Sequence, residues 1–96
     1  MSRENLVDQW FALTRERMPG LAEQRDWPVR MDHCFMRILL DNALGAKWND
    51  EIPAPAYRNV PPEVIERAIA LGEAAISGDE DLAELNRNSL GWRGKG

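Results

Sequence analysis

The stretch Asp32–Gly45, with the sequence DHCFMRILLDNALG, decides the fold because it is the densest apolar run in the chain. Asp32 is suited to begin a helix and Gly45 to end one, since short polar residues cap helix N-termini and glycine adopts the left-handed conformation after a C-terminus. Apolar side chains occupy most of the circumference of such a helix, which is typical of a helix in the middle of a small domain. The sequence therefore predicts a central helix over Asp32–Leu44.

Two further amphipathic segments flank this central helix in the sequence. Ser2–Met18 carries apolar residues at helical spacing, and we expect Pro19-Gly20 to end it because the residue before a proline avoids the helical region. Pro61–Ser77 shows the same spacing, with proline tolerated in the first turn and Gly78 as its stop. These segments predict two helices that cover the central one.

A glycine lies in the middle of the apolar arc of the helix Pro61–Ser77. Gly72 costs about 1 kcal/mol there relative to alanine. The expected compensation is close approach, because Ala68, Gly72 and Ala75 would form a small-residue face for another helix or an indole ring.

The remaining segments complete the predicted domain. We expect a short fourth helix after Asp79-Glu80-Asp81, ending near Asn88, and a long ordered loop over Ala46–Val60 between the second and third helices. Residues 89–96 are predicted to be a flexible basic tail unless Leu90 and Trp92 dock. Since no stretch alternates with period two, the 96 residues predict a single all-α domain, an irregular bundle of three main helices and a short fourth.

Composition narrows the class of protein. The net charge of −4 argues against a general nucleic-acid binder, which needs a basic face. The single Cys34 excludes an intramolecular disulfide and fits a reducing compartment. No run reaches the roughly 18 apolar residues of a membrane span, and the N-terminus lacks a signal-peptide pattern. We therefore expect a cytoplasmic protein, acidic overall, with dimerisation through spare apolar surface as an open option.

A narrow polar stripe on the central helix is the first candidate site. His33, Arg37 and Asp41 share one face because residues four apart are neighbours on a helix. Arg37 could hold an anionic group while His33 moves a proton near neutral pH. The alternative is that the stripe is a solvated face, with Arg37 and Asp41 as an i, i+4 ion pair. If the long loop folds over the helix, Arg58 could join Arg37 at one anion site.

The C-terminal segment is the second candidate site. Trp92 and Arg93 are residue types that often carry interface energy, so this segment is either a docking element for a partner or a strap that packs Trp92 onto the domain's own core. Neither a cofactor nor a metal is expected, because one histidine and one cysteine without ligand spacing do not make a metal site.

Three functions remain open on this basis. The favoured one is a non-enzymatic interaction or ligand-binding domain that contacts a protein or an anionic small molecule through the polar stripe and the Trp92 segment. The second is a small enzyme or sensor pocket that uses His33, Arg37, Asp41 and Arg58. The weakest is a nucleic-acid-binding regulator, because the acidic turn Asp79-Glu80-Asp81 would face the phosphates.

Overall fold

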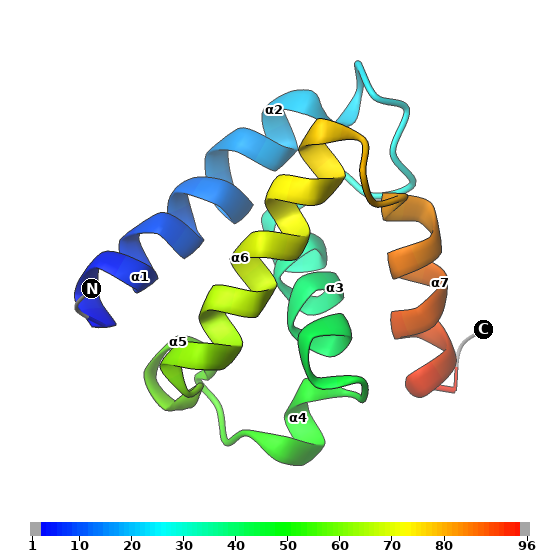
Figure 1. Cartoon of the computed structure of the whole chain (residues 1–96). Helices are drawn as coiled ribbons and strands as arrows, with labels where there is room; N and C mark the ends of the chain where they lie inside the picture. The colour runs from blue at the N-terminus through cyan, green and yellow to red at the C-terminus, as the bar shows by residue number, and fades with distance from the viewer. Residues whose placement is uncertain (1–2, 95–96) are drawn as a thin grey trace.

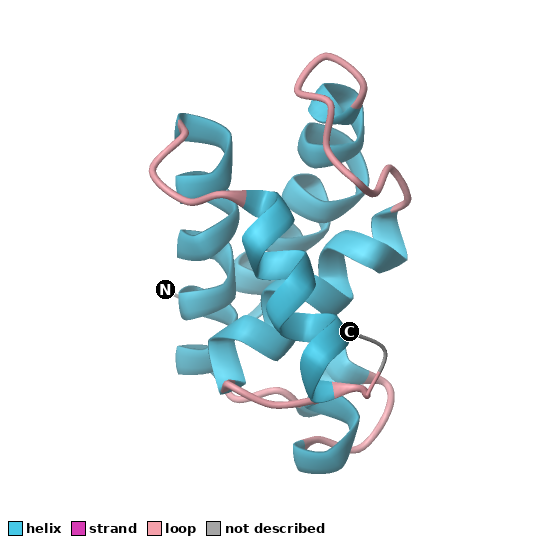
Figure 2. Cartoon of the chain, turned by 90° about the vertical axis from the view of Figure 1, so that its right-hand side faces the viewer, coloured by secondary structure: helices cyan, strands magenta, loops and turns pink. Residues whose placement is uncertain are grey.

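The computed structural model describes residues 3–94, and all regular structure in that range is helical (Figure 1). The elements follow in the order α1 (Arg3–Phe11), η1 (Ala12–Arg17), α2 (Met18–Ala22), α3 (Asp32–Leu44), α4 (Trp48–Glu51), α5 (Ala56–Asn59), α6 (Pro62–Ser77) and α7 (Leu82–Trp92). Helices make up the body of the bundle and loops lie mainly at its two ends (Figure 2). The prediction of an all-α fold is confirmed.

Helix α3 is the central element, with the bounds that the sequence predicts. It packs against η1, α2, α4, α6 and α7, which explains why so much of its circumference is apolar. Gly45 ends it with a left-handed φ of 72°. Asp32 is the first helical residue instead of the cap, and its carboxylate accepts the backbone N–H of His33 at 2.7 Å.

The small-residue face of α6 is confirmed as a place of close approach. A Cβ atom added at Gly72 would lie 2.5 Å from Leu13 Cδ2 and 3.1 Å from Leu39 Cδ1. Ala68 and Ala75 on the same face are buried. The missing side chain therefore lets α6 lie directly against both η1 and α3, as Figure 1 shows for α6 crossing in front of α3.

The prediction that Pro19-Gly20 ends the first helix is wrong. The helical backbone continues from Arg3 through a π-helical segment, η1, into α2, and it stops only after Ala22. A proline inside an α-helix clashes with the carbonyl four residues earlier. In η1 the hydrogen bonds reach back five residues, as when the Met18 N–H donates to the Leu13 carbonyl, so the proline is accommodated without a break.

The prediction of a tail from Ser89 is also wrong for the residues that the structure describes. Helix α7 continues to Trp92, one turn beyond the expected end, and Ser89 is fully buried. Asp81 caps the helix by accepting the Ala83 N–H at 3.0 Å. Lys95 and Gly96 lie outside the described residues. The C-terminal segment is therefore part of the packed domain.

The long loop between α3 and α6 is ordered by two short helices, α4 and α5. Arg3 fixes the second of them from a distance in sequence, because its Nη1 donates to the Val60 carbonyl at 2.6 Å and its Nη2 donates to the Tyr57 carbonyl at 3.0 Å. Tyr57 also packs against Phe11 of α1, with ring centroids 5.5 Å apart. These contacts hold α5 beside α1, where it closes one side of the candidate site.

Candidate functional site

A pocket of about 220 Å³ lies between the first helix, α3 and the loop helices. Its lining is mostly apolar and aromatic, with basic groups added. The lining residues are Trp10, Phe11, Arg15, His33, Met36, Arg37, Leu40, Trp48, Ala56 and Tyr57. The structure thus brings His33 and Arg37 to one concave surface, which Tyr57 also lines.

The pocket combines apolar walls with basic side chains. Trp10 and Leu40 are buried and supply apolar surface. The charged groups are Arg15 and Arg37, and the largely exposed imidazole of His33 lies beside them. Among the described residues that line the pocket, none is a carboxylate. The local charge is therefore positive in a protein whose net charge is −4.

Arg15 reaches the pocket from the π-helical segment. Its guanidinium carbon lies 3.8 Å from the centroid of the Phe11 ring, which is a cation–π contact. Arg17, two residues on, instead pairs with Glu73 of α6 on another face of the molecule. Arg15 therefore adds a cation at the pocket that is oriented by an aromatic ring and not by an acid.

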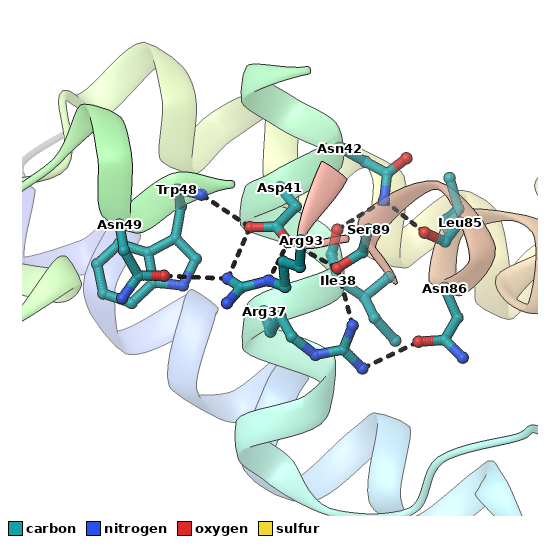
Figure 3. A network of polar contacts seen from close by, with 10 residues as sticks. All are labelled: Arg37, Ile38, Asp41, Asn42, Trp48, Asn49, Leu85, Asn86, Ser89 and Arg93. Atoms are coloured by element: carbon teal, nitrogen blue, oxygen red, sulfur yellow. Dashed lines mark hydrogen bonds and ion pairs between the residues drawn. The ribbon is translucent and has the colours of Figure 1, made fainter. Parts of the chain in front are cut away.

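Arg37 is held by neutral acceptors on α7 (Figure 3). Its Nη1 donates to Ser89 Oγ at 2.8 Å and its Nη2 donates to Asn86 Oδ1 at 2.9 Å. Within residues 3–94, neither Arg37 nor Arg15 forms an ion pair with a carboxylate. The half-buried guanidinium of Arg37 is thus fixed in position without neutralisation of its charge.

Asp41 does not belong to the exposed stripe that the sequence suggests. It is fully buried, and Arg93 binds it with Nε at 2.7 Å and Nη2 at 3.1 Å. Ser89 Oγ donates to it at 2.6 Å, and the Trp48 backbone N–H donates to it at 2.9 Å. The expected Arg37–Asp41 ion pair is therefore replaced by an Arg93–Asp41 pair that ties α3, α4 and α7 together (Figure 3).

The other sequence-predicted site residues lie apart from the pocket. Arg58 is exposed and borders a different depression, beside Arg3 and Asp8, so it does not meet Arg37. Trp92 is 42% exposed at the end of α7. Arg93 is engaged by Asp41 and by Asn49 Oδ1 at 3.0 Å. The structure thus assembles two of the four predicted ligand-binding residues and separates the rest.

Sequence reasoning missed Arg15 and Phe11 as pocket residues. Uniform α-helical spacing places Arg15 on the solvent side of the first helix, with Asp8 and Glu16, away from the core. Arg15 is indeed exposed, and it reaches the pocket because its guanidinium lies over the Phe11 ring. The remaining available signal was the i, i+4 spacing of Phe11 and Arg15, which brings a ring and a guanidinium together on a helix.

No group of three or more His, Cys, Asp or Glu side chains within residues 3–94 is placed to hold a metal ion. No helix there is long and apolar enough to cross a bilayer. Comparison with protein-family models, with curated proteins and with solved structures found no match for this chain.

Proposed function

We propose that this domain binds a small organic anion in the pocket between α1, α3 and α5. The observation that carries the proposal is the pairing of an aromatic, apolar lining with Arg37, a cation that is fixed in place but not neutralised. Apolar walls with a few well-placed polar groups are the usual composition of small-molecule sites.

The size of the pocket limits the ligand. Cavities for drug-sized molecules measure about 300–1,000 Å³, whereas a dry cavity of about 150 Å³ accepts benzene. A pocket of about 220 Å³ lies between these limits. The expected ligand is therefore one ring, or a branched aliphatic group of similar volume, bearing a short acidic substituent.

The charge of the pocket selects the sign of that substituent. Guanidinium groups bind carboxylates through paired N–H donors, and an arginine has five donors in all. Arg37 commits two terminal nitrogens to α7, one hydrogen bond each, so it retains donors for a ligand. Arg15 adds a second cation at the same pocket. A carboxylate seated here would meet two positive groups and no acid among the described lining residues.

A pair of matched probes tests this proposal. Phenylacetate and its neutral isostere phenylacetamide would each be titrated into the ¹⁵N-labelled chain, with the Trp10 and Trp48 indole signals as readouts. A hydrogen bond to a charged group contributes about 1.5–3 kcal/mol, so the amide should bind at least about tenfold more weakly. Equal affinities, or shifts confined to residues outside the pocket, would contradict the proposal.

The role of the Arg37 charge can be tested without removing any of its contacts. Asn86→Asp keeps an oxygen acceptor for Nη2 but places a carboxylate beside the guanidinium. We expect this variant to weaken phenylacetate binding by about tenfold and to leave phenylacetamide binding unchanged. Asn88→Asp is the control, because it adds the same charge to the exposed side of α7. An unaltered phenylacetate affinity in Asn86→Asp would exclude Arg37 as the anion-binding group.

The proposal also covers the cellular location of the domain and its association with a partner or a second copy. We place the domain in the cytoplasm, as the single cysteine suggests, and expect any protein partner or second copy to cover the exposed apolar side chains Met31, Tyr57 and Trp92. Sedimentation velocity over a range of protein concentrations tests the homodimer. A single monomeric species at all concentrations would remove it.

A further inference from the structure

Arg37 takes part both in the pocket and in the contact between α3 and α7. One part of its side chain lines the pocket, while both terminal nitrogens hold α7 through Ser89 and Asn86. Trp48 is shared in the same way, because it lines the pocket and its backbone N–H donates to Asp41, which α7 binds through Arg93. The pocket and the docked position of α7 therefore depend on common residues.

The hydrogen bonds of these residues form one continuous chain. Arg37 donates to Ser89, Ser89 donates to Asp41, and Asp41 is also bound by Arg93 (Figure 3). This chain contains two guanidinium groups and one carboxylate, so it carries a net positive charge. An uncompensated charge that is partly removed from water is unfavourable, and the penalty falls on the arrangement that holds α7 against α3.

An organic anion at Arg37 would supply the missing negative charge. It would also restrict the Arg37 side chain to the position in which it bonds Ser89 and Asn86, so that less side-chain entropy is lost when α7 docks. We propose that binding of an anion in the pocket and docking of α7 on α3 are positively linked. This inference rests on the proposed function, and it makes α7 the element that responds to the ligand.

Thermodynamic linkage works in both directions, so two independent measurements apply. The first is the affinity for phenylacetate in wild type, Asn86→Ala and Asn88→Ala. Asn86 hydrogen-bonds Arg37, whereas Asn88 donates to Asn42 Oδ1 at 3.3 Å, and neither Asn88 nor Asn42 lines the pocket. We expect about fivefold weaker binding in Asn86→Ala and no change in Asn88→Ala, since couplings of this kind are commonly fivefold or more.

The second measurement is hydrogen exchange of the α7 amides with and without saturating phenylacetate. In wild type the ligand should slow hydrogen exchange in α7 about fivefold more than in the half of α6 that lies farther from the pocket. This difference between α7 and α6 should disappear in Asn86→Ala. A loss of α7 packing alone would not produce a ligand-dependent difference. The exchange data therefore separate linkage from simple destabilisation.

The possible outcomes distinguish the two proposals. If wild type does not bind phenylacetate, both proposals fail. If it binds with the same affinity as Asn86→Ala, and the exchange of α7 does not respond, the linkage fails and the ligand-binding function stands. Faster α7 exchange on binding would mean that the anion takes Arg37 away from Ser89 and Asn86, and this would also overturn the linkage.

Discussion

Arg93 at the end of α7 forms an ion pair with Asp41 in the last turn of α3, across 52 residues of sequence, with Nε 2.7 Å from Oδ2. The Asp41 side chain has no exposed surface, and that of Arg93 retains 16%. The C-terminal helix is therefore anchored to α3 by a buried ion pair.

Removal of Arg93 should destabilise the fold strongly. Arg93→Ala leaves the Asp41 carboxylate buried without its cation, and breaking a buried pair in this way costs about 3–5 kcal/mol. Urea unfolding followed by tryptophan fluorescence would measure the loss. Arg87→Ala, a change of the same kind at an exposed position of α7, should stay within about 0.5 kcal/mol of wild type. Equal effects of the two substitutions would show that the pair contributes little.

Two glycines in helices should respond to alanine with opposite signs. Gly72→Ala gains about 1 kcal/mol of helix propensity but places a methyl group 2.5 Å from Leu13 Cδ2. Leu13 is buried, so relieving this contact should cost about 1–3 kcal/mol and leave the variant less stable than wild type by up to about 2 kcal/mol. Gly91→Ala meets no atom within 4 Å and should stabilise α7 by up to about 1 kcal/mol. Thermal unfolding of both variants checks the difference in sign.

The Arg17–Glu73 pair predicts a pH dependence of stability. The side-chain hydrogen bond from Arg17 lowers the pKa of Glu73 in the folded protein. Its stabilisation is thus fully present above the pKa of an unfolded glutamate, about 4.3, and is lost as the pH falls through the lower folded value. Both side chains are about half exposed, so the contribution at neutral pH should not exceed about 1 kcal/mol.

Glu73→Gln tests this pH dependence directly. The free energy of unfolding should fall less steeply below about pH 4.3 in the variant than in wild type. Glu63→Gln, at an exposed position near the start of α6, serves as the comparison. Identical acid limbs for wild type and Glu73→Gln would rule out a role for the pair.

Trp92→Ala tests whether the Trp92 ring packs onto the domain more cleanly than a deletion of the C-terminal segment does. Removal of residues 89–96 would also remove Ser89 and Arg93, which hold α7 on α3. Trp92 is 42% exposed, so Trp92→Ala should reduce the free energy of unfolding by less than about 1 kcal/mol. Chemical denaturation would measure this. A loss of several kcal/mol would show that the ring packs onto the domain, as in the strap interpretation.

The parts of the fold that the sequence predicts well are governed by local rules. Gly45 and Gly78 both have left-handed φ values, 72° and 91°, and each ends its helix where the sequence places the end. Gly72 in an apolar arc correctly indicated close packing, because only a neighbouring side chain explains an unfavourable residue in mid-helix. Each of these glycine signals can be recognised from the sequence of a single helix.

The site was harder to predict because its contacts join distant segments. The i, i+4 spacing of Arg37 and Asp41 suggested that they pair with each other, yet Asp41 binds Arg93 and Arg37 binds Ser89 and Asn86. No local pattern distinguishes a carboxylate that faces water from one that meets an arginine 52 residues away. The packing of α7 on α3 determines that Asp41 binds Arg93 and does not face water.

The π-helical segment has a consequence for the length of the first helix. One row of buried residues in the continuous helix from Arg3 to Ala22 recurs at every fourth position: Leu6, Trp10, Thr14, Met18 and Ala22. In a pure α-helix each such step would turn about 40° too far, so the row would leave the core. The wider turns correct the drift, and the segment is equivalent to one inserted residue. A chain one residue shorter within Ala12–Arg17 would keep its row of buried residues on ordinary α-helical spacing, whereas the same deletion in α3 would rotate every later side chain by about 100°.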